Sequence, residues 1–152
     1  MVHALEEIHR ILKPTGTLIE IHPAVDSPPV VEVRSAGTVT FSESDPGFDY
    51  LDDLRRAEEA VATALDRGVF VIHERRRFEL RTHAASVEEL RDHWAAYGAY
   101  DPEEKDPGIA ERQDRMYGRA HEALRRWPGA ELVYIEPATM SRLTLSPASS
   151  RG

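Results

Sequence analysis

Residues 1–21 read MVHALEEIHRILKPTGTLIEI, and this stretch decides the fold that the sequence predicts. Its first half predicts an amphipathic helix, because apolar side chains recur every three or four residues. Pro14 cannot continue that helix, and Gly16 permits a left-handed turn into a strand. The strand carries apolar side chains toward both faces, which is typical of a parallel strand covered on both sides. This order of elements indicates an α/β fold.

Within that stretch, residues 7–19 read EIHRILKPTGTLI. The segment resembles the "E-I-x-R-v-L-K-P-G-G-x-L" signature of class I S-adenosylmethionine-dependent methyltransferases, and it is most similar to the type 11, small-molecule branch. Thr15 stands where the family has its first glycine, and Gly16 keeps the second. In that family the signature covers a helix and the fifth strand of a seven-stranded sheet.

The resemblance implies that the chain corresponds to the C-terminal half of such an enzyme, with the N-terminal cofactor-binding half absent. Residues 69–82 and 132–145 fit the sixth and seventh strands, and residues 136–138 are expected to interrupt the second of these segments. In the family the seventh strand lies antiparallel between the fifth and sixth. A β-hairpin at 30–41 and a helix capped by Asp49 then form an insertion. We therefore expect a partial Rossmann-like sheet of late strands, mixed parallel and antiparallel, with flanking helices. Residues 1–145 are expected to form a single domain and residues 146–152 a disordered tail.

Two further helices are predicted in the second half of the chain. Ser86 and Glu89 form a capping box that begins the first of them, and Pro107 begins the second. Aromatic side chains recur along these helices at helical spacing, so we interpret them as core, with a pocket lining as the alternative. These side chains are Trp94, Tyr97, Tyr100, Tyr117 and Trp127.

Cofactor binding is not assigned to any residue. Members of the family bind S-adenosylmethionine through a glycine-rich loop and an acidic residue, both upstream of the signature. The nine glycines here are scattered singly. The resemblance alone implies S-adenosylmethionine, and we expect this chain by itself not to bind it. Catalytic residues remain unassigned.

The predicted strand from Thr17 to Ile21 raises a question of partners. In the family, the fifth strand pairs with a fourth strand that this sequence does not contain, so one edge is left open. An open apolar edge invites pairing with another chain. We expect a second copy in a homodimer, the hairpin at 30–41, or a separate N-terminal half to cover it.

Among polar residues, His22 is the candidate for substrate binding. It lies at the C-terminal end of the first predicted strand, where α/β sheets place their ligands. Arg75, Arg76 and Arg77 could hold an anionic ligand, although a solvated strand face is the preferred interpretation. Neighbouring acids such as Glu58 and Glu59 diverge on a helix, so they indicate a charged face. The seven histidines show no metal-ligand spacing, and no metal site is predicted.

Composition excludes several classes of partner. The 152 residues are 41% hydrophobic and 30% charged, as in a globular domain. The formal net charge of −8 opposes binding to nucleic acid. No apolar run approaches the roughly 20 residues that cross a bilayer, so no membrane partner is expected. The absence of cysteine and of a signal peptide fits a cytoplasmic location.

The resemblance implies the substrate-side half of a small-molecule methyltransferase that is not active alone. The alternative is a non-catalytic dimeric remnant or a small-ligand-binding domain. Whether the chain is an enzyme stays open at this stage, because the family is catalytic and its cofactor loop is missing here.

Overall fold

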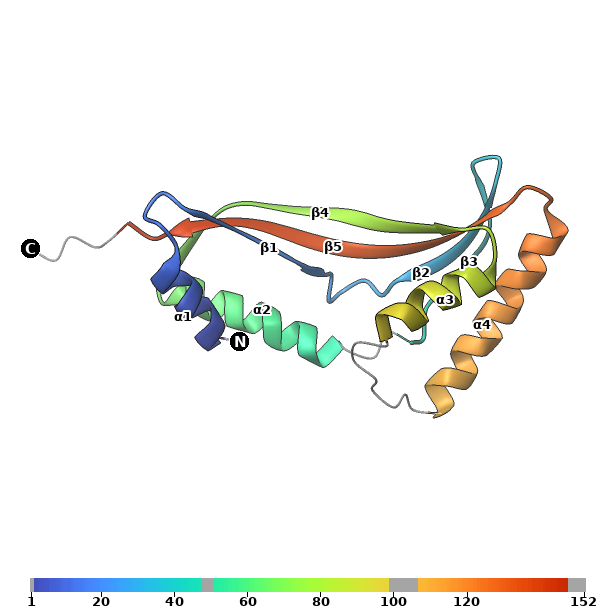
Figure 1. Cartoon of the computed structure of the whole chain (residues 1–152), viewed down its shortest axis with the longest axis horizontal. Coiled ribbons are helices and arrows are strands. Elements are labelled where there is room, and N and C mark those ends of the chain that lie inside the picture. Colours follow the sequence, from blue (N-terminus) through green and yellow to red (C-terminus); the bar gives the residue numbers. More distant parts are fainter. Residues whose placement is uncertain (1, 48–50, 99–106, 148–152) are drawn as a thin grey trace, which may run out of the picture. The chain divides into compact units, whose positions relative to one another are not determined.

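A computed structural model describes residues 2–47, 51–98 and 107–147 (Figure 1). Residues 148–152 of the predicted tail and the predicted cap Asp49 lie outside these ranges. The elements follow in this order: α1 (Val2–Ile11), β1 (Thr17–Pro23), β2 (Val30–Ser35), β3 (Thr38–Ser44), α2 (Leu51–Asp66), β4 (Phe70–Ala84), α3 (Val87–Gly98), α4 (Pro107–Arg126) and β5 (Glu131–Leu145).

The chain divides into two compact units, each with its own hydrophobic core. Unit 1 consists of Met1–Asp26, Tyr50–Phe78 and Pro137–Gly152, and unit 2 of Ser27–Asp49 and Glu79–Glu136. Helices α1 and α2 and strand β1 belong to unit 1. Helices α3 and α4 and the hairpin β2–β3 belong to unit 2, and β4 and β5 contribute to both. The single domain over residues 1–145 stays a prediction.

The α/β class is confirmed, but the prediction of a mixed sheet is wrong. The strand order is β1–β5–β2–β3, and β4 also pairs with β5. The pairs β1–β5, β2–β5 and β2–β3 are all antiparallel. Within the described ranges, β1 has no parallel neighbour, because the strand beside it is β5, which runs the opposite way.

Strand β5 lies between β1 and β4 in unit 1. Residues 138–144 of β5 pair with β1 along one edge. Side chains from the same stretch meet β4: Arg75 contacts Ser141 at 3.2 Å, and His73 contacts Thr144 at 2.7 Å. Since β1 occupies one edge of this stretch, β4 pairs along the other.

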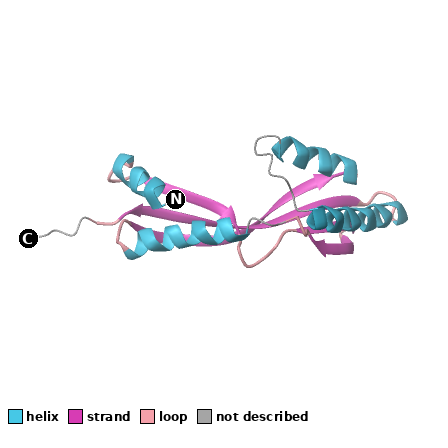
Figure 2. Cartoon of the chain, turned by 90° about the horizontal axis from the view of Figure 1, so that it is seen from below, coloured by secondary structure: helices cyan, strands magenta, loops and turns pink. Residues whose placement is uncertain are grey.

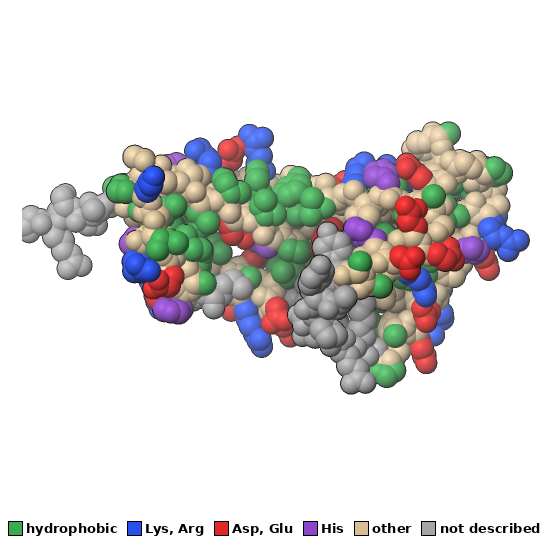
Figure 3. All heavy atoms as spheres, viewed as in Figure 1, with side chains coloured by type: hydrophobic (Ala, Val, Ile, Leu, Met, Phe, Trp, Pro, Cys, Tyr) green, Lys and Arg blue, Asp and Glu red, His purple; other side chains and the backbone are tan. Residues whose placement is uncertain are grey.

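Strand β1 is covered on one face only, contrary to the two-sided prediction. Leu18 and its partner Leu143 pack against α1 and α2, which both lie on that face (Figures 1 and 2). On the opposite face, Ile19 is 50% exposed and Ile21 is 56% exposed. Hydrophobic side chains are visible along this part of the sheet in Figure 3. The physical reason is that a strand's side chains alternate, and helices cover just one side here.

The predicted break between residues 135 and 140 is also absent, because β5 runs without interruption through Pro137. Pro137 has no N–H to donate to a neighbouring strand. It lies between the stretch that pairs with β2 and the stretch that pairs with β1, and its carbonyl accepts from Ala24 N at 2.8 Å. On this edge of β5, Pro137 belongs to neither the ladder with β2 nor the ladder with β1, and such a position tolerates a proline.

Several local predictions are confirmed with physical detail. The hairpin turn uses Ala36 and Gly37, both at positive φ. The capping box is formed, since Ser86 Oγ accepts from Glu89 N at 3.1 Å.

The prediction of a left-handed turn at Gly16 is wrong. Gly16 does not adopt positive φ, and an added Cβ there would come within 2.7 Å of the Leu12 side chain. Glycine is therefore needed at position 16 for close approach rather than for a left-handed turn.

Unit 2 builds its core between α3, α4, β2 and β5. Leu90, Met116 and Leu132 are fully buried there. Trp94 and Tyr117 join this cluster as predicted, whereas Trp127 is 49% exposed. Trp127 follows the last residue of α4, so its side chain does not lie on the helix face that packs against the sheet.

Candidate functional site

Polar side chains occupy the covered face of the sheet in unit 1. Register places Glu20 opposite Ser141 and His22 opposite Thr139, and paired residues in antiparallel strands point to the same face. Ser141 is fully buried, and His22 and Thr139 are less than a tenth exposed. Burying polar groups costs free energy unless they are hydrogen-bonded. A polar cluster beneath a helix is therefore a candidate for function.

His22, the predicted substrate-binding residue, lies in this cluster. Its Nδ1 lies 2.7 Å from the carbonyl oxygen of Pro23. A carbonyl can only accept, so this nitrogen carries a proton and donates. The Nε2 atom faces two carboxylates, at 3.5 Å from Glu20 Oε1 and 3.8 Å from Glu58 Oε1. His22 lies near the C-terminal end of β1, as expected, and its contact with substrate stays a prediction.

Glu20 is the least satisfied member of the cluster. Its Oε2 is buried and has no hydrogen-bond partner among the described residues. A buried acceptor without a partner typically costs about 1–3 kcal/mol. The sequence analysis missed Glu20. The available signal was an acid and a histidine two residues apart within an apolar strand, which places both on one face.

A pocket of about 230 Å³ lies beside this cluster in unit 1. Its lining combines the loop after β1 with side chains of α2, β4 and β5: Ala24, Val25, Asp26, Glu58, Arg75, Arg77 and Thr139. Glu58 connects the pocket to His22, because it lines the one and approaches the other. Glu58 thus has a specific position that the interpretation as a charged helix face did not predict.

The two arginines of the pocket differ in their partners. Arg77 donates to both oxygens of Asp26, at 2.9 and 2.6 Å, and this hydrogen bonding raises the pKa of Arg77. Arg75 donates to Ser141 Oγ at 3.2 Å. In the part of the chain that the structure describes, no carboxylate lies within ion-pairing distance of Arg75. Arg75 therefore lines the pocket without a carboxylate held against its guanidinium.

The other arginine of the predicted run does not join the pocket. Arg76 is exposed and pairs with Glu74 at 2.5 Å. The run is split by strand alternation, so that Arg75 and Arg77 line the pocket and Arg76 does not. The solvated-face interpretation holds for Arg76, and the anion-binding alternative fits the geometry of Arg75.

The arrangement suits a small polar molecule. Arg75 offers donors to an anionic group, Thr139 offers a hydroxyl, and Glu58 offers an acceptor at the side of His22. Across residues 2–47, 51–98 and 107–147, no three histidine or acidic side chains gather as metal ligands do. No helix in those ranges has the length and apolar composition needed to span a membrane.

Comparison of the chain with protein-family models, with curated proteins and with solved structures returned no match.

Proposed function

We propose that this chain is the substrate-side half of an S-adenosylmethionine-dependent small-molecule methyltransferase and that it is not active alone. One observation carries the proposal: β5 lies between β1 and β4 and runs antiparallel to β1. The family that the signature at residues 7–19 resembles places its seventh strand in this way between its fifth and sixth. Signature and strand order are independent, since the first is local and the second joins segments more than a hundred residues apart.

The position of the pocket gives further support. The loop Ala24–Asp26 leaves the C-terminal end of β1 and lines the pocket, and α/β sheets bind ligands at such strand ends. In the proposed role, Arg75 holds an anionic group of the methyl acceptor. His22 and Glu58 orient its reacting oxygen or nitrogen and take up its proton. Positioning of this kind can supply most of a transfer rate, so few catalytic groups are needed.

The residues described do not fit the cofactor itself. Gly37, Gly68 and Gly129 take positive φ at separate turns, and nothing lies within 4 Å of where their side chains would begin. Gly16 is crowded by the side chain of Leu12, which directly follows α1. None of these glycines forms part of a loop that could cradle S-adenosylmethionine, whose role would be to supply the methyl group. In this proposal, other residues bind the cofactor.

The decisive experiment joins a cofactor half to this chain. The DNA upstream of the Met1 codon is read in frame for a glycine-rich segment, and the extended protein is assayed with labelled S-adenosylmethionine and a panel of small carboxylic acids. We expect methyl transfer, with Arg75→Gln raising KM about tenfold at nearly constant kcat. The matched control Arg76→Gln removes the same charge outside the pocket and should leave KM unchanged.

Two results would contradict the proposal. One is the absence of any glycine-rich segment in frame or in a separately encoded partner. The other is an extended protein that binds S-adenosylmethionine but methylates none of the acids. Calorimetry on the present chain adds a check, because micromolar binding of S-adenosylmethionine here would show that our account of the cofactor site is wrong.

A second candidate function is a non-catalytic dimer that binds a small ligand, and the outer edge of β1 favours it. Within the described ranges β1 pairs only with β5, while the hairpin strands pair with each other and with β5. The prediction that the hairpin covers β1 is therefore wrong. A homodimer or a separate N-terminal half remains proposed for that edge, which carries the exposed Ile19 and Ile21.

Sedimentation of the present chain at high micromolar concentration tests this edge. A dimer should form and should weaken about tenfold or more in Ile21→Lys, because a charge would enter an apolar contact. Val39→Lys changes a similarly exposed side chain on β3 and should have no effect. A chain that stays monomeric at all concentrations would exclude the homodimer. A separate N-terminal half would then be the remaining candidate to cover the β1 edge.

A further inference from the structure

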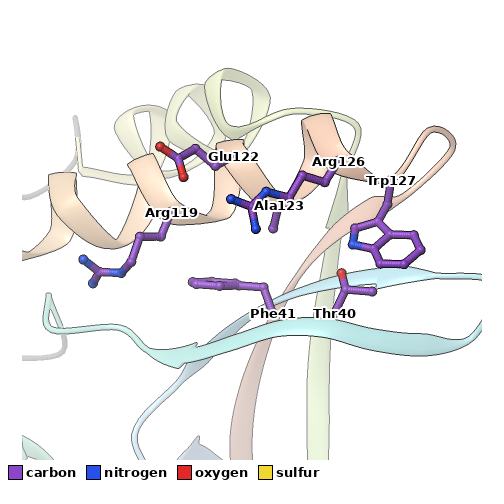
Figure 4. A pocket seen from close by; sticks show the side chains of 7 residues that line it. All are labelled: Thr40, Phe41, Arg119, Glu122, Ala123, Arg126 and Trp127. Atoms are coloured by element: carbon purple, nitrogen blue, oxygen red, sulfur yellow. The ribbon is translucent and has the colours of Figure 1, made fainter.

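A second pocket lies wholly within unit 2, between β3 and the last turns of α4 (Figure 4). Its volume is about 270 Å³. The strand supplies Thr40 and Phe41, the helix supplies Arg119, Glu122, Ala123 and Arg126, and Trp127 follows the helix. None of these residues takes part in the function proposed for unit 1.

The charges of this pocket are unbalanced. Arg119 is neutralised, since it donates to both oxygens of Glu43, and this hydrogen bonding raises its pKa. Arg126 has no carboxylate within 4 Å in the described part of the chain. Glu122 lines the pocket, but Figure 4 shows its carboxylate on the far side of the helix from Phe41. The pocket therefore presents an uncompensated guanidinium.

This imbalance is unusual for the composition of the chain. Aspartate and glutamate number 27 against 19 lysines and arginines, so acids are plentiful. Arginines such as Arg34, Arg81 and Arg91 each pair with one. A cation at the C-terminal end of a helix is stabilised by the helix dipole, which accounts for a positive charge here. The dipole does not account for a guanidinium that lines a pocket together with an aromatic ring.

Aromatic groups form the rest of the surface. Figure 4 shows the Phe41 ring beneath the Arg126 side chain and the Trp127 ring at one end, with its Nε1 turned toward the pocket. The indole nitrogen only donates, as does the guanidinium. Thr40 Oγ1 already donates to the Val33 carbonyl, at 3.1 Å. The free groups are thus donors, set beside a flat apolar face.

We propose that this pocket binds a small aromatic carboxylate. The ring would lie on Phe41, and the carboxylate would accept from the Arg126 guanidinium in a fork geometry and from Trp127 Nε1. Neutral aromatic molecules would leave the guanidinium without an acceptor, and anions without a ring would leave the Phe41 face in water. Both features of the pocket therefore select for one class of ligand.

The test follows the two indole N–H signals of the full chain by NMR while benzoate is added. The Trp127 signal, identified with Trp127→Phe, should shift to saturation at millimolar benzoate, whereas the Trp94 signal stays in place. Acetate lacks the aromatic ring and benzyl alcohol lacks the carboxylate, so each should bind about tenfold more weakly than benzoate. An acetate response equal to that of benzoate would overturn the aromatic part, and an equal response to benzyl alcohol would overturn the anionic part.

Substitution of one arginine at a time gives the matched comparison. Arg126→Gln should weaken benzoate about tenfold, and Arg126→Lys should recover little of that loss because a lysine lacks the fork. Arg125→Gln removes the same charge from a residue that does not line this pocket, and it should change affinity by less than about twofold. Equal losses at positions 125 and 126, or no saturable shift in the unmodified chain, would refute the site.

Discussion

Both units pack two helices against their strands, but they bury different chemistry beneath those helices. In unit 2, the covered strand positions are apolar, as at Val31, Val33 and Leu132. In unit 1, one end of the covered face is apolar at Leu18 and Leu143, and the other end carries Glu20, His22, Thr139 and Ser141. Apolar burial stabilises a fold, whereas polar burial costs free energy.

The contrast extends to buried carboxylates. Asp45 in unit 2 is buried, and its Oδ1 accepts from Gly47 N at 2.8 Å and from Gln113 Nε2 at 2.9 Å. Glu20 in unit 1 has a buried oxygen with no hydrogen-bond partner in the described residues. We infer that the polar residues of unit 2 serve the fold and that those of unit 1 serve a ligand. The following predictions test that difference.

The largest effect is expected in the apolar core of unit 2. Leu90 is fully buried, so Leu90→Ala should lower the free energy of unfolding by about 3 kcal/mol. Urea unfolding followed by circular dichroism measures the loss. Leu80→Ala, at a position that is 47% exposed, is the control and should cost less than about 1 kcal/mol. Similar losses at both positions would show that the core is not where we place it.

The satisfied carboxylate should give the next largest effect. Asp45→Ala removes an acceptor from Gly47 N and Gln113 Nε2, so it should lower the free energy of unfolding by about 2 kcal/mol. The same urea titration measures it. A neutral result would mean that solvent replaces Asp45 without cost, and the contrast with Glu20 would then lose its basis.

Glu20 should respond with the opposite sign. Glu20→Met fills the same space without a buried unpartnered oxygen, so we expect the free energy of unfolding to rise by about 1 kcal/mol. If the variant instead proves less stable than the original protein, Glu20 supports the fold, and our inference of a ligand-directed role for this cluster is wrong.

A smaller effect, below about 1 kcal/mol near pH 10, should appear in unit 2. Burial raises the pKa of Tyr117, and the negative charge of Asp45 adds to the rise. The native state then holds this proton more tightly than the unfolded state. The resulting stabilisation is complete below the unfolded pKa of about 10 and is lost as pH rises above it.

Unfolding free energies measured between about pH 9 and pH 11 check this sign. Stability should fall above about pH 10 by at most about 1.4 kcal/mol per pH unit from this group. Tyr117→Phe should remove that contribution and flatten the profile. An unchanged slope in Tyr117→Phe would assign the alkaline loss to other groups.

The sequence predicted local structure well where one residue type has one physical consequence. Pro14 lies just beyond the end of α1 and cannot continue that helix. Ser86 and Glu89 cap α3, and Gly37 closes the hairpin at positive φ. The prediction from sequence was wrong where one residue pattern fits two structures. The apolar alternation in β1 was interpreted as cover on both faces, but Ile19 and Ile21 are exposed. Periodicity reports which side chains share a face, and it does not report whether that face is covered.

The candidate site shows the same division. His22 could be chosen from sequence because it lies near the C-terminal end of an apolar strand that comes directly after Gly16. Its neighbours could not be chosen, because Glu58 and Arg75 lie 36 and 53 positions further along the chain. Packing of α2 against the sheet brings Glu58 to His22, and pairing of β5 with both β1 and β4 brings Arg75 to the same pocket. Strand alternation then places Arg75 and Arg77, but not Arg76, at the pocket.

The amino-acid sequence by itself determined local features such as the start of α3 and the turn of the hairpin, because caps, prolines and glycines act over a few residues. The tertiary structure alone decided which polar groups are buried together, the direction of the sheet and the exposure of one face of β1. Those properties depend on contacts between distant segments, whose free energies are set by burial and pairing rather than by local propensity.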